Sequence, residues 1–298
     1  MSVTFVVVPE WQGSGSSRAM RLIDGAESIR GDLPSAATHL VEVPMEAGEE
    51  QETGIHRFSS LTEIRSRIER VLVSVASADP QTTTITIGGD CAVELAATSS
   101  ALARWRESGQ PGENSRGDEN GQGTVAVVWF DAHADLNTPR SSPSGSFSGM
   151  VLRALLGESA AGLRAEGPGV VSAGELVLAG VRSMDEAESD FLASNGIPLV
   201  SVEQLATPDA LVAAVDATGA SAVYLHVDLD VIDPAEFEGV GFPEPFGVTT
   251  EQLTTAIRAL TARFTVAGAG ITGFSPASPE DAGHDLPAIL RVLGALTR

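Results

Sequence analysis

The segment VAVVWFDAHADLNTP, residues 125–139, decides the fold prediction for this chain of 298 residues. Its first five residues form an apolar run that predicts a buried β-strand. Asp131, His133 and Asp135 follow at alternate positions, and alternate residues of an extended segment lie on the same face. The segment therefore predicts two carboxylates and an imidazole that point into one space at the C-terminal end of the strand.

A cation would explain why these charged groups come together. Two anions side by side repel each other, and oxygen ligands with imidazole suit Mn²⁺ or a similar divalent ion. A solvated turn is the alternative. A second cluster favours the metal site, because the apolar run at residues 222–227 is followed by Asp228 and Asp230, which share a face. The two clusters together would bring four carboxylates and a histidine to one end of a parallel sheet.

Strand-like runs alternate with helical patterns along the whole chain. Apolar residues recur at helical spacing within residues 64–75 and 253–264, for example. This alternation predicts a single α/β domain over residues 1–298, with three α/β/α layers, a mainly parallel sheet and active-site loops at the C-terminal ends of the strands. The polar, glycine-rich stretch 107–123 is predicted to be a mobile surface insertion. Strands are expected at residues 4–8, 84–87, 124–130, 175–179, 198–201, 222–227 and 269–274.

Composition narrows the classes of function. The net charge is −22, and all 18 basic residues are arginine. Nucleic acid is not expected as a partner, because phosphate binding needs a basic surface, and the lack of lysine excludes Schiff-base chemistry and a Walker A loop. The N-terminal apolar run is too short for a signal peptide or membrane span, and the single cysteine excludes an intramolecular disulfide. We therefore expect a cytoplasmic protein that does not associate with membranes.

Three motifs together resemble those of the ureohydrolase superfamily, the arginase, agmatinase and formimidoylglutamase group. Its signatures are Gly-Gly-Asp-His, Asp-Ala-His-x-Asp and Asp-x-Asp-x-x-Asp-Pro. Here they read GGDC at residues 88–91, DAHAD at 131–135 and DLDVIDP at 228–234. The resemblance covers about residues 80–280 and implies an arginase-like fold. It also implies a binuclear-metal amidinohydrolase, in which a metal-bridging hydroxide cleaves a C–N bond of a small linear guanidino or amidino substrate.

The resemblance further implies how two divalent ions would be held. Asp131 and Asp228 would bridge both ions, Asp135 would complete one shell, and His133 with Asp230 would complete the other. His133, Asp135 and Asp230 are the expected catalytic residues.

Cys91 departs from the family, which has a histidine ligand on the Asp135 side at this position. A metal lowers the pKa of a thiol, so Cys91 can still be a ligand. Mn²⁺ is the expected ion, and the softer thiolate makes Zn²⁺, Fe²⁺ or Co²⁺ alternatives. Two other interpretations of Cys91 stay open: a small buried hydrophobe and a covalent nucleophile.

The loop after Asp135 departs from the family at a catalytic position. In arginases this loop binds the amino-acid end of the substrate and supplies a proton-shuttling histidine, where this chain has Ser148. We expect Asn137, Ser144 and Ser148 to contact the substrate. A serine hydroxyl cannot act as a general acid near neutral pH, so a metal-bound water or Asp230 would protonate the leaving amine. Hydroxyarginine amidinohydrolase resembles this chain in its cysteine and its missing shuttle histidine, which favours a modified guanidine as substrate.

Two further segments bear on substrate binding. Residues 180–188 resemble a family element that contacts the substrate's α-amino group, and they keep Asp185 and Glu188. The alternative is a charged helix N-terminus with favourable dipole interactions. After the last strand the family places a glutamate that pairs with the guanidinium. The best alignment puts Ser278 there, and a slip of one or two residues would bring in Glu280. Loss of that glutamate would weaken guanidine binding by about a few kcal/mol.

Two functions follow from these observations. The first is the binuclear-metal amidinohydrolase. The second is a catalytically silent member of the family that keeps the fold for metal binding or assembly, which the three departures would favour. Because ureohydrolases commonly assemble as trimers or hexamers, the resemblance also implies a homo-oligomer.

Overall fold

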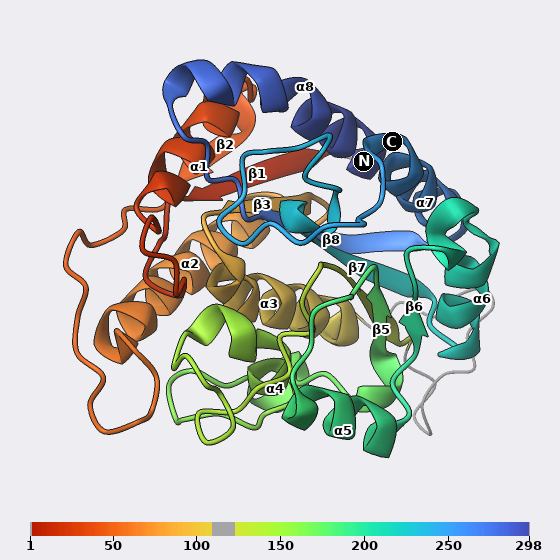
Figure 1. Cartoon of the computed structure of the whole chain (residues 1–298), viewed down its shortest axis with the longest axis horizontal. Coiled ribbons are helices and arrows are strands. Elements are labelled where there is room, and N and C mark those ends of the chain that lie inside the picture. Colours follow the sequence, from red (N-terminus) through yellow and green to blue (C-terminus); the bar gives the residue numbers. More distant parts are fainter. Residues whose placement is uncertain (1, 109–122, 298) are drawn as a thin grey trace.

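A computed structural model describes residues 2–108 and 123–297, and these residues form three layers (Figure 1). Within them the middle layer is an eight-stranded sheet in the order β2-β1-β3-β8-β7-β4-β5-β6, with parallel neighbours throughout. The predicted α/β fold with a parallel sheet is therefore confirmed. The strands are β1 Val3–Val8, β2 Thr38–Leu40, β3 Thr83–Gly88, β4 Val125–Phe130, β5 Leu176–Ala179, β6 Leu199–Val200, β7 Ala222–Asp228 and β8 Thr265–Thr272.

Helices cover both faces of the sheet (Figure 1). One face packs against α1 (Arg21–Gly31), α6 (Asp209–Ala217), α7 (Thr250–Arg263) and α8 (Pro279–Leu296). The other packs against α2 (Phe58–Ala78), α3 (Glu94–Glu107), α4 (Val151–Leu155) and α5 (Glu186–Asn195). Helix α2 shows the pattern behind this packing, because Ile64, Ile68, Leu72 and Val75 are buried at helical spacing.

The order of the strands brings distant segments of the chain together. Strands β3 and β4 follow each other among the strands of the chain, but β8 and β7 lie between them in the sheet. All residues of β3, β4 and β7 are buried, as expected for parallel strands covered on both faces. Because the strands are parallel, the segments that follow β3, β4, β7 and β8 meet at one edge of the sheet.

Three strands differ from the sequence prediction. Strand β2 was not predicted, because it is a three-residue edge strand with His39 and Leu40 exposed and no apolar pattern. Strand β6 is reduced to two residues. Strand β8 begins at Thr265, four residues before the predicted start, because its first three residues are only partly buried and give a weaker apolar signal. Of the predicted insertion 107–123, residues 109–122 lie outside the described residues, so both the insertion and the single domain stay predictions.

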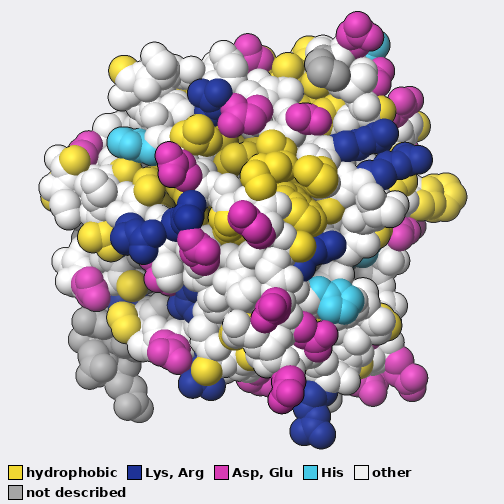
Figure 2. Space-filling model, turned by 90° about the vertical axis from the view of Figure 1, so that its left-hand side faces the viewer, with side chains coloured by type: hydrophobic (Ala, Val, Ile, Leu, Met, Phe, Trp, Pro, Cys, Tyr) yellow, Lys and Arg dark blue, Asp and Glu magenta, His cyan; other side chains and the backbone are white. Residues whose placement is uncertain are grey.

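The face on the β1–β2 side of the molecule is shown in Figure 2. Hydrophobic side chains gather at its centre among acidic and basic ones. Among the residues that the structure describes, no helix is long and apolar enough to cross a membrane.

Candidate metal centre

The motif residues meet beyond the C-terminal ends of three strands. Asp131 directly follows β4, Asp228 is the last residue of β7, and Cys91 begins the short helical turn after β3. The Cys91 Sγ lies 3.0 Å from Asp228 Oδ2 and 4.0 Å from Asp131 Oδ2. On the other side of Asp131, His133 Nδ1 lies 3.4 Å from Asp131 Oδ1 and 3.0 Å from Asp230 Oδ2.

Backbone groups fix the orientation of these carboxylates. Asp131 Oδ1 accepts a hydrogen bond from the His133 N–H at 2.6 Å, and Asp228 Oδ1 accepts one from the Asp230 N–H at 2.9 Å. Gly273 gives Asp228 the room it needs, because a Cβ atom there would lie 2.2 Å from Asp228 Oδ1. The backbone of Gly273 also has a φ of +87°, which favours glycine.

Two groups of side chains have the geometry to hold a metal ion. One consists of Cys91, Asp131, His226 and Asp228, and the other of Asp131, His133 and Asp230, with the ligand atoms of each group within 4.8 Å of one another. Asp131 belongs to both, as a bridging carboxylate would. Asp135 belongs to neither group, although it lines the same pocket.

The electrostatics of these side chains fit a bound cation. Burial, followed by repulsion from neighbouring carboxylates, raises the pKa of Asp135, Asp228 and Asp230. Burial and then Asp228 raise the pKa of the Cys91 thiol well above its usual range. For Asp131 the burial effect is outweighed by the neighbouring imidazoles of His133 and His226, which lower its pKa. A divalent ion would offset the unfavourable energy of burying these anions, so the residues present suit a metal.

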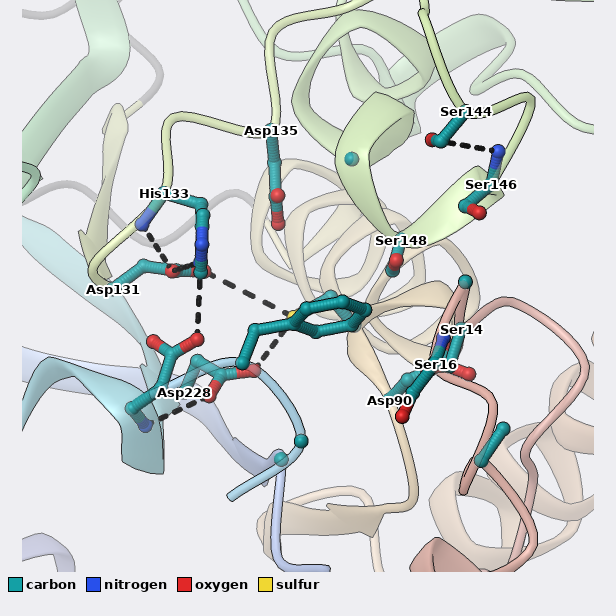
Figure 3. Close-up of a pocket in the computed structure, with 18 of the residues that line it drawn as sticks. Ser14, Ser16, Asp90, Asp131, His133, Asp135, Ser144, Ser146, Ser148 and Asp228 are labelled. Atoms are coloured by element: carbon teal, nitrogen blue, oxygen red, sulfur yellow. Dashed lines mark hydrogen bonds and ion pairs between the residues drawn. The ribbon is translucent and has the colours of Figure 1, made fainter. Parts of the chain in front are cut away.

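Asp135 gives a further sign of a ligand. Its Oδ2 is buried without a hydrogen-bond partner, and its φ is +51°, a strained conformation for a residue other than glycine. In Figure 3, its side chain points into the space between His133 and Ser148. A buried carboxylate oxygen that is held toward a pocket without a partner fits a metal or a cationic substrate.

The pocket above the carboxylates has a volume of about 270 Å³. Its outer wall is rich in serine, with Ser144, Ser146 and Ser148 on the loop after β4 and Ser14 and Ser16 on the loop after β1 (Figure 3). Apart from His133, the described residues that line it include no basic side chain. The carboxylates and the absence of another basic side chain among these lining residues therefore suit a cationic ligand.

The structure places most of the predicted substrate contacts in the pocket, with one exception. Asn137, Ser144, Ser148 and Glu188 line the pocket, but Asp185 does not. Asp185 instead forms the N-cap of α5 and accepts a hydrogen bond from the Asn137 side chain at 2.7 Å. Its capping role corresponds to the helix N-terminus that the sequence left as the alternative.

The predicted alignment of the segment after β8 is wrong. Ser278 is the N-cap of α8, and Glu280 is an exposed residue of its first turn. Neither lines the pocket, which receives Gly273 and Ser275 from this segment. Serine before an acidic helical turn is a capping pattern, and this local signal accounts for the position better than a substrate contact.

Sequence reasoning missed several residues of the centre. His226 lies two positions before Asp228 on the same strand, so the alternation that linked Asp228 with Asp230 also placed His226 on that face. The acids Glu10, Asp90 and Glu94 are buried nearby, and Phe242 packs edge-on against His133. Glu10 and Phe242 come from segments outside the three motifs, so only the fold brings them to the site.

The parallel sheet, the shared carboxylate and the second metal group are features of a metal-dependent hydrolase of the ureohydrolase class. The model of the Arginase family matches residues 12–292, and the chain belongs to this family. This membership supports an amidinohydrolase function, and the comparisons do not favour the catalytically silent alternative.

Individual relatives agree with this membership. Arginase from Staphylococcus aureus (strain MRSA252) is 24% identical over 247 residues, which cover 81% of this chain and 74% of that protein. The crystal structure of Entamoeba histolytica arginase in complex with L-ornithine has a TM-score of 0.81 at 21% identity and covers 99% of this chain and 98% of its own. Formimidoylglutamase from Bacillus subtilis has a TM-score of 0.68 at 17% identity and covers 99% and 87%. Both structures share the fold.

Proposed function

We propose that this chain hydrolyses a C–N bond of a small linear guanidino or amidino compound with two divalent ions. The observation that carries the proposal is the position of Asp131, which belongs to both groups of ligand residues. A pair of bound divalent ions supplies hydroxide at neutral pH and stabilises the charge that develops on the attacked carbon's substituents. Mn²⁺ is the proposed ion, with Zn²⁺, Fe²⁺ or Co²⁺ as alternatives because of Cys91.

The chain's own residues would orient the substrate and move protons. Glu188 lines the pocket and is held by the Leu136 N–H, so it can face a cationic group of the substrate. Asn137, held by Asp185, and Ser144 would contact the polar end of the substrate. Asp230 is the proposed proton carrier, because it lies beside His133 and its pKa is raised by burial and by Asp228.

Ser148 bears on the choice of substrate. Its hydroxyl lines the pocket but cannot supply a proton at neutral pH. A leaving amine of low basicity needs less protonation, so we propose a modified guanidine, such as an N-hydroxyguanidine, over arginine. The proposal includes a cytoplasmic homo-oligomer, trimeric or hexameric, that does not bind nucleic acid or membranes.

Hydrolysis by the Mn²⁺-loaded protein tests this function. We expect turnover of at least one of arginine, agmatine and N-hydroxyarginine, with the hydroxylated compound favoured. Asp131→Asn should reduce turnover by at least about 100-fold, because it removes the shared ligand charge. Asp190→Asn, an exposed change on α5, is the matched control. Two bound metals without turnover of any guanidino or amidino compound would favour the silent alternative.

A further inference from the structure

His226 is a fully buried histidine on the metal-facing side of β7. Tyr224, His226 and Asp228 alternate along the strand and so share this face. The ring stacks on Trp129, the neighbouring residue of β4, with ring centroids 3.5 Å apart. Stacking explains the orientation of the ring plane but not what the two ring nitrogens bind.

One ring nitrogen faces the motif residues. His226 Nε2 lies 3.7 Å from Cys91 Sγ and 3.8 Å from Asp131 Oδ2. The distance to Asp131 exceeds an ordinary N···O hydrogen bond, and the contact with Cys91 is a long, weak N···S hydrogen bond. Ligand atoms that share one ion at about 2.0–2.3 Å lie roughly 3.3–3.8 Å apart in tetrahedral geometry. His226 Nε2 is therefore spaced from Cys91 Sγ and from Asp131 Oδ2 as ligands of one ion would be.

The other ring nitrogen faces a buried carboxylate. His226 Nδ1 lies 3.7 Å from Glu94 Oε2 and has no hydrogen-bond partner. Glu94 is itself fully buried and accepts a hydrogen bond from the Tyr224 hydroxyl at 2.7 Å. Gly270 of β8 makes room for Glu94, because a Cβ atom there would lie 1.8 Å from its Oε1. A carboxylate behind the distal nitrogen is the usual support of a metal-bound histidine.

We propose that His226 is a metal ligand through Nε2, with Glu94 as the positioning residue that holds its Nδ1 proton. Strand β7 would then supply an imidazole to the ion on the Cys91 side, where the first motif has Cys91 in place of the family's histidine. The site would be completed by Cys91, Asp131 and Asp228, a mixed sulfur, nitrogen and oxygen set. The proposal rests on the proposed function only in assuming that this centre binds metal.

A variant at the other metal group gives the sharpest test. His133→Asn removes the only other histidine of the two metal groups, and His133 is partly exposed, so the change should not disrupt the core. We load this variant with Mn²⁺ and record pulsed EPR with and without ¹⁵N-labelled histidine. The coupling of a directly bound imidazole nitrogen should remain. In wild type two such couplings are expected. One coupling in wild type, or none in metal-loaded His133→Asn, would overturn the proposal.

Metal affinity gives a second readout. His226→Asn should weaken binding of one of the two ions by at least about 100-fold, and Glu94→Gln by about 10–100-fold. His39→Asn, an exposed change on β2, should leave affinity unchanged. Unchanged binding of both ions in a folded His226→Asn variant would contradict the proposal. Neither readout depends on turnover of a substrate. A protein with two imidazole ligands but no hydrolysis would therefore refute the proposed function and leave this inference intact.

Discussion

Arg182 is the residue whose replacement should most clearly loosen the candidate centre. Its guanidinium donates to the backbone carbonyls of Gly180, Val231, Asp230, Glu244 and Pro245 at 2.7–3.3 Å. Four of these bonds, all but the one to Gly180, tie the segment after β5 to two segments after β7, one of which carries Asp230. Burial of the guanidinium lowers the pKa of Arg182, but nearby acids such as Asp230 and Glu244 favour its charged form.

Arg182→Met keeps most of the side-chain length and removes all five bonds. A hydrogen bond to a charged group contributes about 1.5–3 kcal/mol where water is excluded. The guanidinium is only half-buried and water can replace part of these bonds, so we expect a loss of about 2–4 kcal/mol rather than the full sum. For a chain of this size that loss lowers Tm by roughly 5–10 °C.

Thermal and urea unfolding of metal-free protein would measure this effect. Affinity for Mn²⁺ should also fall, by about 10-fold, because the segment that carries Asp230 is no longer held. Arg263→Met removes an exposed ion pair with Asp216 and should leave Tm close to that of wild type. A loss below about 1 kcal/mol in Arg182→Met, with unchanged metal affinity, would refute the reasoning.

Three further predictions concern single contacts and pH. Tyr224→Phe should lower the free energy of unfolding in urea by about 1–3 kcal/mol, because it removes the shorter of the two hydroxyl donors to the buried Glu94 carboxylate and leaves only Thr98 at 3.5 Å; a change within error would contradict this. Gly273→Ala should displace Asp228 and lower Mn²⁺ affinity at least about 10-fold by calorimetry; normal affinity would show that the close approach is harmless. Against the effect of burial, hydrogen bonds to Asp131 and Asp230 raise the pKa of His133 to about 12 in the metal-free protein. Charged His133 then contributes its full stabilisation of the folded protein below its unfolded pKa of about 6.5. The Tm of the metal-free protein should therefore fall as pH rises above that value, and a rise in Tm would contradict the predicted sign.

The fold and the position of the centre could be predicted because their signals are local. An apolar run followed by alternate acids marks both a buried strand and the end at which its acids gather, as for Asp131 and Asp228. The edge strand β2 escaped prediction because exposed residues carry no apolar pattern.

The supporting residues could not be predicted to the same extent. Glu94 reaches His226 from α3, and only the packing of α3 on β7 brings the two together. The role of Asp185 depends on whether its carboxylate turns to the helix or to the pocket, which spacing alone does not determine. Resemblance also misplaced Ser278, because the capping signal of α8 competes with the family alignment in the same few residues.

The central claim is that one chain holds two ions that share Asp131. Elemental analysis of protein purified without chelator and reconstituted with Mn²⁺ tests it most directly, with EPR to detect magnetic coupling. The account predicts close to two ions per chain, coupled to each other, and loss of that coupling in Asp131→Asn. Absence of bound metal in excess Mn²⁺, or two uncoupled ions that persist in Asp131→Asn, would contradict it.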